Sequence, residues 1–187
     1  MSDTITTLKT RRSCRAYKPE HVEEEKLQAI LEAGTYAPTG LGKQSPIILV
    51  IKDQETRQKL AKLNAAAMGM DNDPFYGAPD LVVVLANKDM PTYVYDGSLV
   101  MGNMMNAAAG LGVASCWVHR AKEEFESEEG KAILKKLGIE GNYEGIGNLI
   151  LGYAAKPAGQ AAPRKADYEL SGIRGTEGLF YIELRCL

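Results

Sequence analysis

The sequence is poor in the residues that bind metals and form disulfides. Its 187 residues include only two histidines, His21 and His119, and three cysteines, Cys14, Cys116 and Cys186. No CxxC or HxxxH spacing occurs among them, so we predict neither a zinc site nor another metal centre. Three widely spaced cysteines make no even disulfide set, which is typical of reduced thiols in a cytoplasmic protein.

Long apolar segments and a strong net charge are also missing. No apolar run reaches the roughly 20 residues that span a bilayer, and the first residues lack the apolar region of a signal peptide. The formal net charge is −2, so the surface as a whole does not attract nucleic acid or a membrane. We therefore expect a cytoplasmic protein with neither kind of partner.

The sequence does contain enough apolar residues for one folded domain. Hydrophobic residues make up 45% of the chain, and its length suits a single core. Apolar runs predict buried strands at Pro46–Asp53, Pro79–Lys88, Gly112–His119 and Gly145–Tyr153. Helical spacing predicts helices at Asp3–Lys9, from about Val22 to Ala37, at Gln54–Ala67 and Tyr93–Gly110, and a charged surface helix at Glu123–Leu137. We expect one α+β domain over residues 1–187, with a central four-stranded sheet surrounded by helices.

Two segments have a more specific interpretation. The helix at Tyr93–Gly110 is apolar around too much of its circumference for an ordinary surface helix, so we place it both in the core and at a subunit interface. Gly178–Leu184 is predicted as a last strand, separated from the others by a long segment without predicted structure. Such an isolated strand is expected to pair with a neighbouring chain.

Several familiar sequence motifs are only partly present. In "GTYAPTGLGK" the position required for a phosphate-loop glycine is Thr35, and Lys43 is followed by Gln44 rather than Ser or Thr. "GLGVAS" ends a helix and enters a strand, the reverse of the order in a dinucleotide-binding motif. Ser98 lacks the glycines of a nucleophile elbow. Any chemistry is therefore expected to belong to a bound organic cofactor.

The segment "TRRSCRAYKPE" concentrates positive charge near the N-terminus. In an extended chain Arg11, Ser13 and Arg15 share one face, and guanidinium groups match phosphate oxygens in geometry and charge. A second basic pair, Arg164 and Lys165, lies in "AAPRKADY". Two interpretations stay open: solvated charges at a helix end and in a loop, or cations that converge on one dianionic phosphate.

Five short segments, taken in their order and spacing, resemble those of a known family. "RRSCRAY", "APTGLGKQSP", "GLGVASCWVH", "GNLILGY" and "APRK" follow one another over about Thr10 to Tyr168. In this order and at these distances they resemble the nitroreductase family of FMN-dependent oxidoreductases. The resemblance implies a mixed, mainly antiparallel sheet and a homodimer with two FMN sites at the subunit interface. It also implies a C-terminal tail, about 170–187, exchanged with the partner chain.

The resemblance further implies which residues bind FMN. Phosphate and ribityl oxygens would be held by Arg11, Arg12 and Ser13, with Arg164 and Lys165 completing the phosphate site, and Arg15 would lie at the N1–C2=O edge of the ring. The partner chain would supply Pro38, Thr39 and Gly40, and Gln44 would hydrogen-bond to the ring or the ribityl chain. The far face of the ring would meet Trp117, Val118, His119 and Arg120, with a backbone N–H toward N5, and Asn64 would be a ring-contacting asparagine. Gly42 departs from the family, which often has asparagine there.

The implied chemistry is ping-pong transfer from NAD(P)H to nitroaromatic, quinone or similar flat electrophilic substrates. Arg15 would stabilise negative charge at the N1–C2=O edge, and no side chain is assigned as an acid or base because solvent can protonate the products. Two alternatives stay open: another FMN enzyme of the same fold, acting in reductive dehalogenation or flavin breakdown, and a flavin-binding protein without turnover. The segment Ala65–Tyr76 is either a lid or a surface loop that buries its own apolar side chains.

Overall fold

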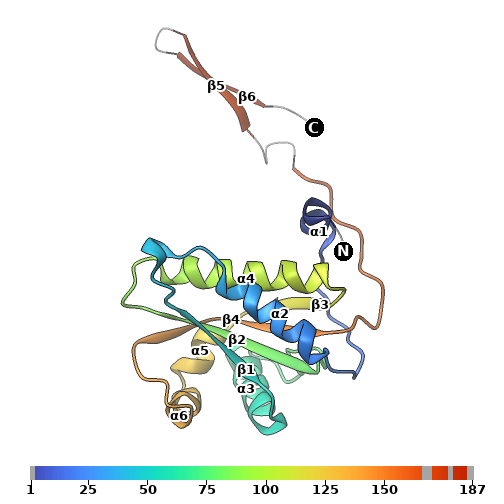
Figure 1. Cartoon of the computed structure of the whole chain (residues 1–187), viewed down its shortest axis with the longest axis vertical. Helices are drawn as coiled ribbons and strands as arrows, with labels where there is room; N and C mark the ends of the chain where they lie inside the picture. The colour runs from blue at the N-terminus through green and yellow to red at the C-terminus, as the bar shows by residue number, and fades with distance from the viewer. Residues whose placement is uncertain (1–2, 166–169, 177–178, 185–187) are drawn as a thin grey trace.

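A four-stranded sheet lies at the centre of the protein (Figure 1). In this computed structural model, which describes residues 3–165, 170–176 and 179–184, the strand order is β1 (Pro46–Ile51), β2 (Asp80–Asn87), β4 (Tyr143–Gly152), β3 (Ala114–Val118). Each neighbouring pair runs antiparallel, and an isolated parallel bridge joins Ser13 to Ser115. The predicted α+β fold with a mainly antiparallel sheet is confirmed.

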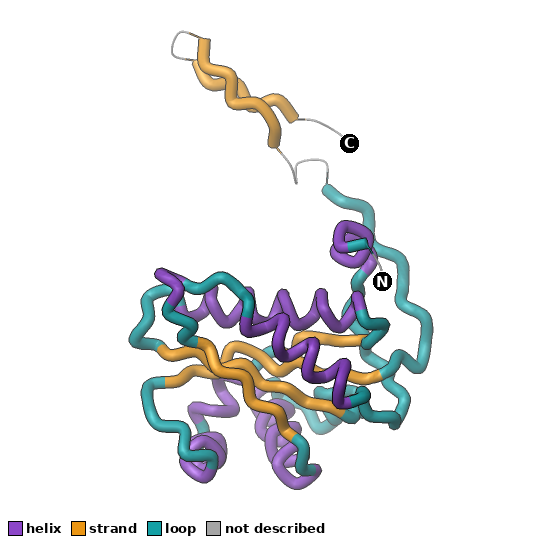
Figure 2. Tube along the Cα trace, viewed as in Figure 1, coloured by secondary structure: helices purple, strands orange, loops and turns teal. Residues whose placement is uncertain are grey.

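Helices cover both faces of this sheet, as Figure 2 shows. One face packs against α2 (Glu24–Thr35) and α4 (Tyr93–Gly110). The other packs against α3 (Gln54–Ala67), α5 (Ala121–Glu126) and α6 (Glu128–Lys136). Because β2 and β4 lie between the two layers, their side chains are buried on both faces, and this explains why both strands appear in the sequence as continuous apolar runs.

The long helix α4 has one face in the core and one in solvent. Met101 and Met104 are fully buried against the sheet, which confirms the predicted core position. On the other side, Val94, Tyr95 and Leu99 are 42%, 71% and 46% exposed. Neighbouring exposed apolar side chains of this size are typical of interaction surfaces, so the interface remains a prediction. No helix in the described residues is long and apolar enough to cross a membrane.

The region predicted as one charged surface helix differs from that prediction. The structure has two helices, α5 and α6, joined at Ser127, whose extended backbone (φ −68°, ψ 158°) interrupts the helical path. The Ser127 hydroxyl accepts a hydrogen bond from Gly130 N at 3.0 Å, so this serine is an N-cap. Glu124 in α5 is fully buried rather than on the surface. A capping serine inside a charged run therefore ends one helix and begins the next, which the charge pattern alone does not indicate.

The C-terminal strands correct a second prediction. β5 (Leu170–Thr176) and β6 (Leu179–Leu184) pair antiparallel with each other as a separate two-stranded sheet. The expectation that the last strand has no partner in its own chain is therefore wrong. The segment "LSGIRGT" went unrecognised because two glycines and a charge interrupt its apolar pattern. Residue 178, where the predicted strand began, lies outside the described residues.

The structure also bears on the segment Ala65–Tyr76, which the sequence leaves open as either a lid or a surface loop. Phe75, predicted either to line an entrance or to be tucked in, is fully buried in the core layer that contains α3. Met70 and Tyr76 are 41% and 40% exposed. At Phe75 the geometry therefore favours a loop that buries its own apolar side chain.

One glycine controls how closely α5 approaches the sheet. A Cβ at Gly145 would lie 2.1 Å from the carbonyl oxygen of Ala121 and 2.8 Å from Lys122 N. Because both neighbours are backbone atoms, we expect Gly145→Ala to lower the free energy of unfolding by about 1–3 kcal/mol, measured by urea denaturation. Gly110→Ala is the control, since its Cβ would meet nothing within 4 Å and a helical alanine is favoured by roughly 0.5–1 kcal/mol. Equal losses in the two variants would contradict this explanation.

Candidate functional site

The arginine-rich segment, residues 11–15, lines a cavity of the molecule. After α1 (Thr4–Thr10) the chain runs extended beside the start of β3, with Cys14 N donating to Ser115 O at 3.0 Å. Between this segment, β3 and the loop after β4 lies a cavity of about 520 Å³, which we call the arginine pocket. Its charged lining side chains are Arg11, Arg12, Arg15 and Lys156. This volume is in the range of small-molecule sites.

The arginine pocket is built for an anion. No Asp or Glu is among its lining residues, and none of its three guanidinium groups forms an ion pair with a described residue. Arg12 donates to the carbonyl oxygens of Lys9 and Arg11, at 2.9 and 2.6 Å. Arg11 Nη1 and Arg12 Nε are buried and have no hydrogen-bond partner among the described residues. Buried cationic donors without acceptors are costly unless a ligand supplies the acceptor.

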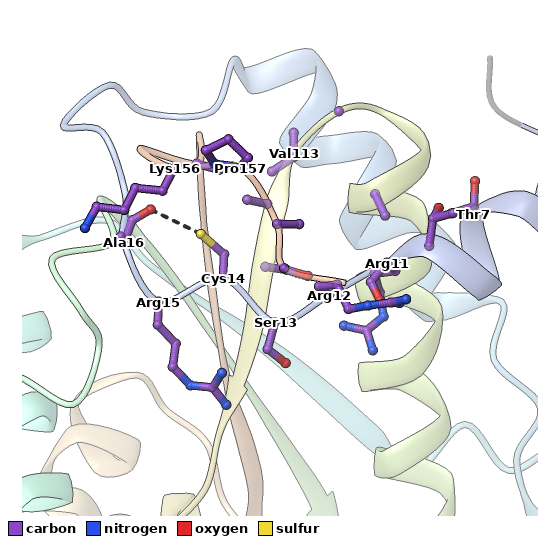
Figure 3. A pocket seen from close by; sticks show the side chains of 18 residues that line it. Thr7, Arg11, Arg12, Ser13, Cys14, Arg15, Ala16, Val113, Lys156 and Pro157 are labelled. Atoms are coloured by element: carbon purple, nitrogen blue, oxygen red, sulfur yellow. Dashed lines mark hydrogen bonds between the residues drawn. The ribbon is translucent and has the colours of Figure 1, made fainter. Parts of the chain in front are cut away.

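Figure 3 shows two ends of this pocket. The Arg11 and Arg12 side chains lie together near Thr7, whereas the Arg15 side chain extends away from them (Figure 3). Ser13 and Arg15 point to one side of the extended segment and Cys14 to the other, where its thiol donates to Ala16 O at 3.2 Å. The alternation expected of extended chain thus separates polar groups from the thiol.

The structure brings together only part of the predicted phosphate site. Arg164 and Lys165 are exposed and are not among the lining residues of the arginine pocket. Arg164 instead donates to the carbonyl oxygen of Ala162, at 2.6 Å from Nη2. The cation that the loop after β4 does contribute is Lys156, which sequence reasoning missed. The sequence feature that could have indicated it is a single lysine soon after "GNLILGY", in a stretch otherwise rich in Gly, Pro and Ala.

A second cavity, the tryptophan pocket, lies at the end of β3. It measures about 310 Å³ and is lined by Trp117, His119 and Arg120, together with residues of α4 and β4. The Trp117 indole lies over Gly147, where a Cβ would come within 2.1 Å of Nε1. Val118 points the other way and is buried in the core. Three of the four predicted residues of this stretch therefore line one cavity, and the fourth packs beneath it.

The loop after α2 lines a third cavity, of about 400 Å³, which includes Thr39 and Gln44. Pro38 is exposed and Gly40 half-buried, and neither lines this cavity. Asp96 of α4, which is 3% exposed, holds the loop by accepting from Gly40 N at 3.0 Å. Sequence reasoning missed Asp96, although a lone acid in an apolar helix was a usable signal.

Gly42 has a conformational explanation. It lies in the short helix η1 (Gly40–Gly42) with φ +65°. The left-handed region is open to glycine and, among other residues, most readily to asparagine and aspartate. The positive φ therefore favours glycine at this position.

Asn64 does not reach any of these three cavities. It is fully buried on α3, and its amide donates to His119 O at 2.6 Å and to Oε1 of Glu124. The resemblance implies that Asn64 contacts the flavin ring, whereas the structure uses both of its amide N–H groups inside the protein. Its connection to the site is through the backbone of the tryptophan pocket.

Comparison with known proteins identifies the family of this chain. The sequence model of the Nitroreductase family matches residues 8–69, which include the arginine segment and the loop after α2. A nitroreductase family protein from Clostridium difficile 630 is 30% identical, with 86% of this chain and 88% of that one covered and a TM-score of 0.67. This chain belongs to the nitroreductase family.

Two further members of the family show how far the likeness extends. A nitroreductase from Bacteroides fragilis, solved with bound FMN, has a TM-score of 0.80 at 27% identity, over 93% of this chain and 100% of that one. A protein of Archaeoglobus fulgidus named as an NADH dehydrogenase/NAD(P)H nitroreductase is 28% identical over 158 residues, 82% of this chain and 86% of that one. The likeness thus covers most of both chains in each of these comparisons.

Proposed function

We propose that this nitroreductase-family chain is an FMN-dependent oxidoreductase that uses NAD(P)H to reduce nitroaromatic, quinone or similar flat electrophilic substrates. The observation that carries the proposal is the arginine pocket, where buried guanidinium N–H groups of Arg11 and Arg12 have no acceptor among the described residues. A phosphate dianion supplies acceptors of matching geometry. Family membership makes the flavin phosphate the candidate.

The residues present fit an FMN group. Arg11, Arg12 and Ser13 would hold the phosphate and the ribityl oxygens, and Lys156, from the loop after β4, adds a fourth cation to the lining of the same pocket. Arg15, which extends away from the other two arginines (Figure 3), would lie at the N1–C2=O edge of the ring. When bound, FMN would supply two-electron transfer between NAD(P)H and the substrate, with the two binding in turn in a ping-pong order.

The protein's own contribution is electrostatic and positional. The Arg15 guanidinium would stabilise negative charge at the edge of the ring. The end of β3, with Trp117 and His119 lining the tryptophan pocket, would form the wall on the other face. No acidic or basic side chain is assigned to proton transfer, because water can protonate the reduced product.

A homodimer would complete the site. In one chain the predicted residues are divided among three cavities, and the loop residues Pro38–Gly40 would reach the ring from the partner subunit. The exposed apolar side chains of Leu41, at 91%, and Tyr95, at 71%, offer surface for such an interface. The β5–β6 hairpin, as part of the tail 170–187, would be exchanged with the partner.

A titration and a rapid-kinetic trace test the proposal. Purified protein is mixed with FMN, and binding is followed by quenching of flavin fluorescence. The complex is then mixed with NADH or NADPH in a stopped-flow instrument, where loss of absorbance near 450 nm is expected. A complex that stays yellow would indicate a flavin-binding protein without turnover, and absence of binding would refute the proposal.

Arg15→Ala is expected to retain FMN but to slow flavin reduction by NAD(P)H at least tenfold. The reason is loss of a preorganised positive charge where negative charge develops, and removal of a comparable donor in other enzymes costs on the order of 100-fold or more. The control is Lys18→Ala, which removes an exposed charge three positions away that does not line the pocket. Equal reduction rates in Arg15→Ala and wild type would remove Arg15 from this role.

A further inference from the structure

Three buried polar side chains meet behind the tryptophan pocket. Glu124 of α5, Asn64 of α3 and Asn148 of β4 are all fully buried. Oε1 of Glu124 accepts hydrogen bonds from the amides of both asparagines, at 2.7 Å for Asn148. Polar groups of three elements therefore share one acceptor inside an apolar layer. Such a network is costly unless its groups are hydrogen-bonded, and where they are it makes the surrounding structure more rigid.

The task visible in the structure is to hold the turn between β3 and α5. Two consecutive carbonyl oxygens of this turn are held from the same cluster. Asn64 Nδ2 donates to His119 O at 2.6 Å, and the backbone N–H of Glu124 donates to Arg120 O at 3.0 Å. The side chain and the backbone of Glu124 thus act on successive peptide groups.

The turn requires such support because its backbone is strained. Arg120 has φ 78° and ψ 9°, in the left-handed region. A residue with a Cβ costs roughly 1–3 kcal/mol there and stays only when the surroundings determine it. Such positions often occur at ligand-binding sites. This one lies between His119 and α5, on the wall of the tryptophan pocket.

The hydrogen-bond inventory indicates a neutral carboxylic acid in the cluster. Oε2 of Glu124 and Oδ1 of each asparagine are buried acceptors without a donor among the described residues. A proton on Glu124 is the donor that the cluster itself can add. Burial raises the pKa of Glu124 to about 8. The hydrogen bonds from Asn64 and Asn148 act to lower this pKa, and the negative charge of Glu123 acts to raise it. The raised pKa favours the neutral form of Glu124, which would supply this donor.

We propose that Asn64 and Glu124 are positioning residues for the flavin: Glu124 orients the Asn64 amide, which holds the His119 carbonyl and sets the peptide groups of His119 and Arg120 against the ring. This inference rests on the proposed function, because the turn acts only if a flavin occupies the adjoining cavity. Asn64 thereby influences the ring through the backbone rather than by contact.

Four variants test this role. Asn64→Leu and Glu124→Leu remove the polar groups, Glu124→Gln keeps a neutral group of similar shape, and Leu60→Ala is the matched control. Leu60 is also fully buried and lies one turn before Asn64 on the same face of α3. The readouts are amide hydrogen exchange of residues 117–121 in flavin-free protein, FMN affinity, and the visible spectrum of bound FMN.

We expect Asn64→Leu and Glu124→Leu to speed exchange at 117–121 at least tenfold, to weaken FMN binding about tenfold and to shift the flavin spectrum. Glu124→Gln should restore affinity and spectrum toward wild type, while Leu60→Ala lowers stability without these changes. A wild-type spectrum and affinity in Asn64→Leu, or the same flavin changes in Leu60→Ala, would overturn the inference. Failure of wild-type protein to bind FMN would instead refute the proposed function itself.

Discussion

Replacement of Arg11 and Arg12 together by alanine is expected to weaken FMN binding by roughly two to four orders of magnitude. Each charge-assisted hydrogen bond contributes about 1.5–3 kcal/mol, and each 1.4 kcal/mol is about tenfold in Kd. The unpaired buried donors Arg11 Nη1 and Arg12 Nε are the groups that a phosphate would satisfy. Quenching of FMN fluorescence measures the affinity directly.

Riboflavin makes this experiment specific, since it has the same ring and ribityl chain without the phosphate. If the two arginines bind phosphate, the double variant should bind riboflavin nearly as well as wild type does. Equal losses for FMN and riboflavin would show that the arginines act elsewhere, and unchanged FMN affinity would remove them from the site.

The same assay can decide which residue, Lys156 or Arg164, adds a further cation to the phosphate site. Lys156 lines the arginine pocket, whereas Arg164 is exposed and bonded to Ala162 O. Lys156→Ala should therefore weaken FMN binding selectively over riboflavin. The resemblance assigned this position to Arg164 and Lys165, so an equal selective loss in Arg164→Ala would mean that the loop rearranges when the dimer and flavin are present.

Local patterns predicted the central strands because β2 and β4 are buried on both faces, whereas β1, also predicted as buried, is mostly half-buried at the edge of the sheet. The runs in β2 and β4 are apolar along most of their length, and no alternation had to be interpreted. Where burial is one-sided or a capping residue interrupts a charged run, the pattern is weaker. For this reason the pattern does not indicate the helix break at Ser127 or the strand β5, whose glycines interrupt its apolar residues.

The site was predictable where chemistry is local and not where it is assembled from distant residues. Arg11, Arg12, Ser13 and Arg15 are adjacent in sequence, and the structure places them in one pocket. The cluster behind the tryptophan pocket joins Asn64 to Glu124 and Glu124 to Asn148, across 60 and 24 positions. Nothing in the neighbourhood of any one of them indicates the other two. Glu124 in particular lies between Glu123 and Phe125 in a charged segment, where a carboxylate normally faces water.

The burial of Glu124 predicts an unusual dependence of stability on pH. Its pKa is raised to about 8 in the folded protein, mainly by burial, from 4.5. Between these values the unfolded chain has released the proton that the folded chain keeps, so the free energy of unfolding falls as pH rises. The contribution is fully present below about pH 4.5 and is lost by about pH 8.

Glu124→Gln should remove this dependence, because the amide stays neutral at every pH. At 1.36 kcal/mol per pKa unit, the stability of the variant relative to wild type should increase by on the order of 3–5 kcal/mol between pH 4.5 and 8.5, measured by urea denaturation at several pH values. Glu123→Gln is the control: burial acts to raise the pKa of Glu123, but the hydrogen bond from Arg120 lowers it overall. Its substitution should leave the fall in stability between pH 5 and 8 in place. Parallel stability curves for wild type and Glu124→Gln would mean that the folded protein holds Glu124 as a carboxylate, and the neutral donor inferred for the cluster would have to be abandoned.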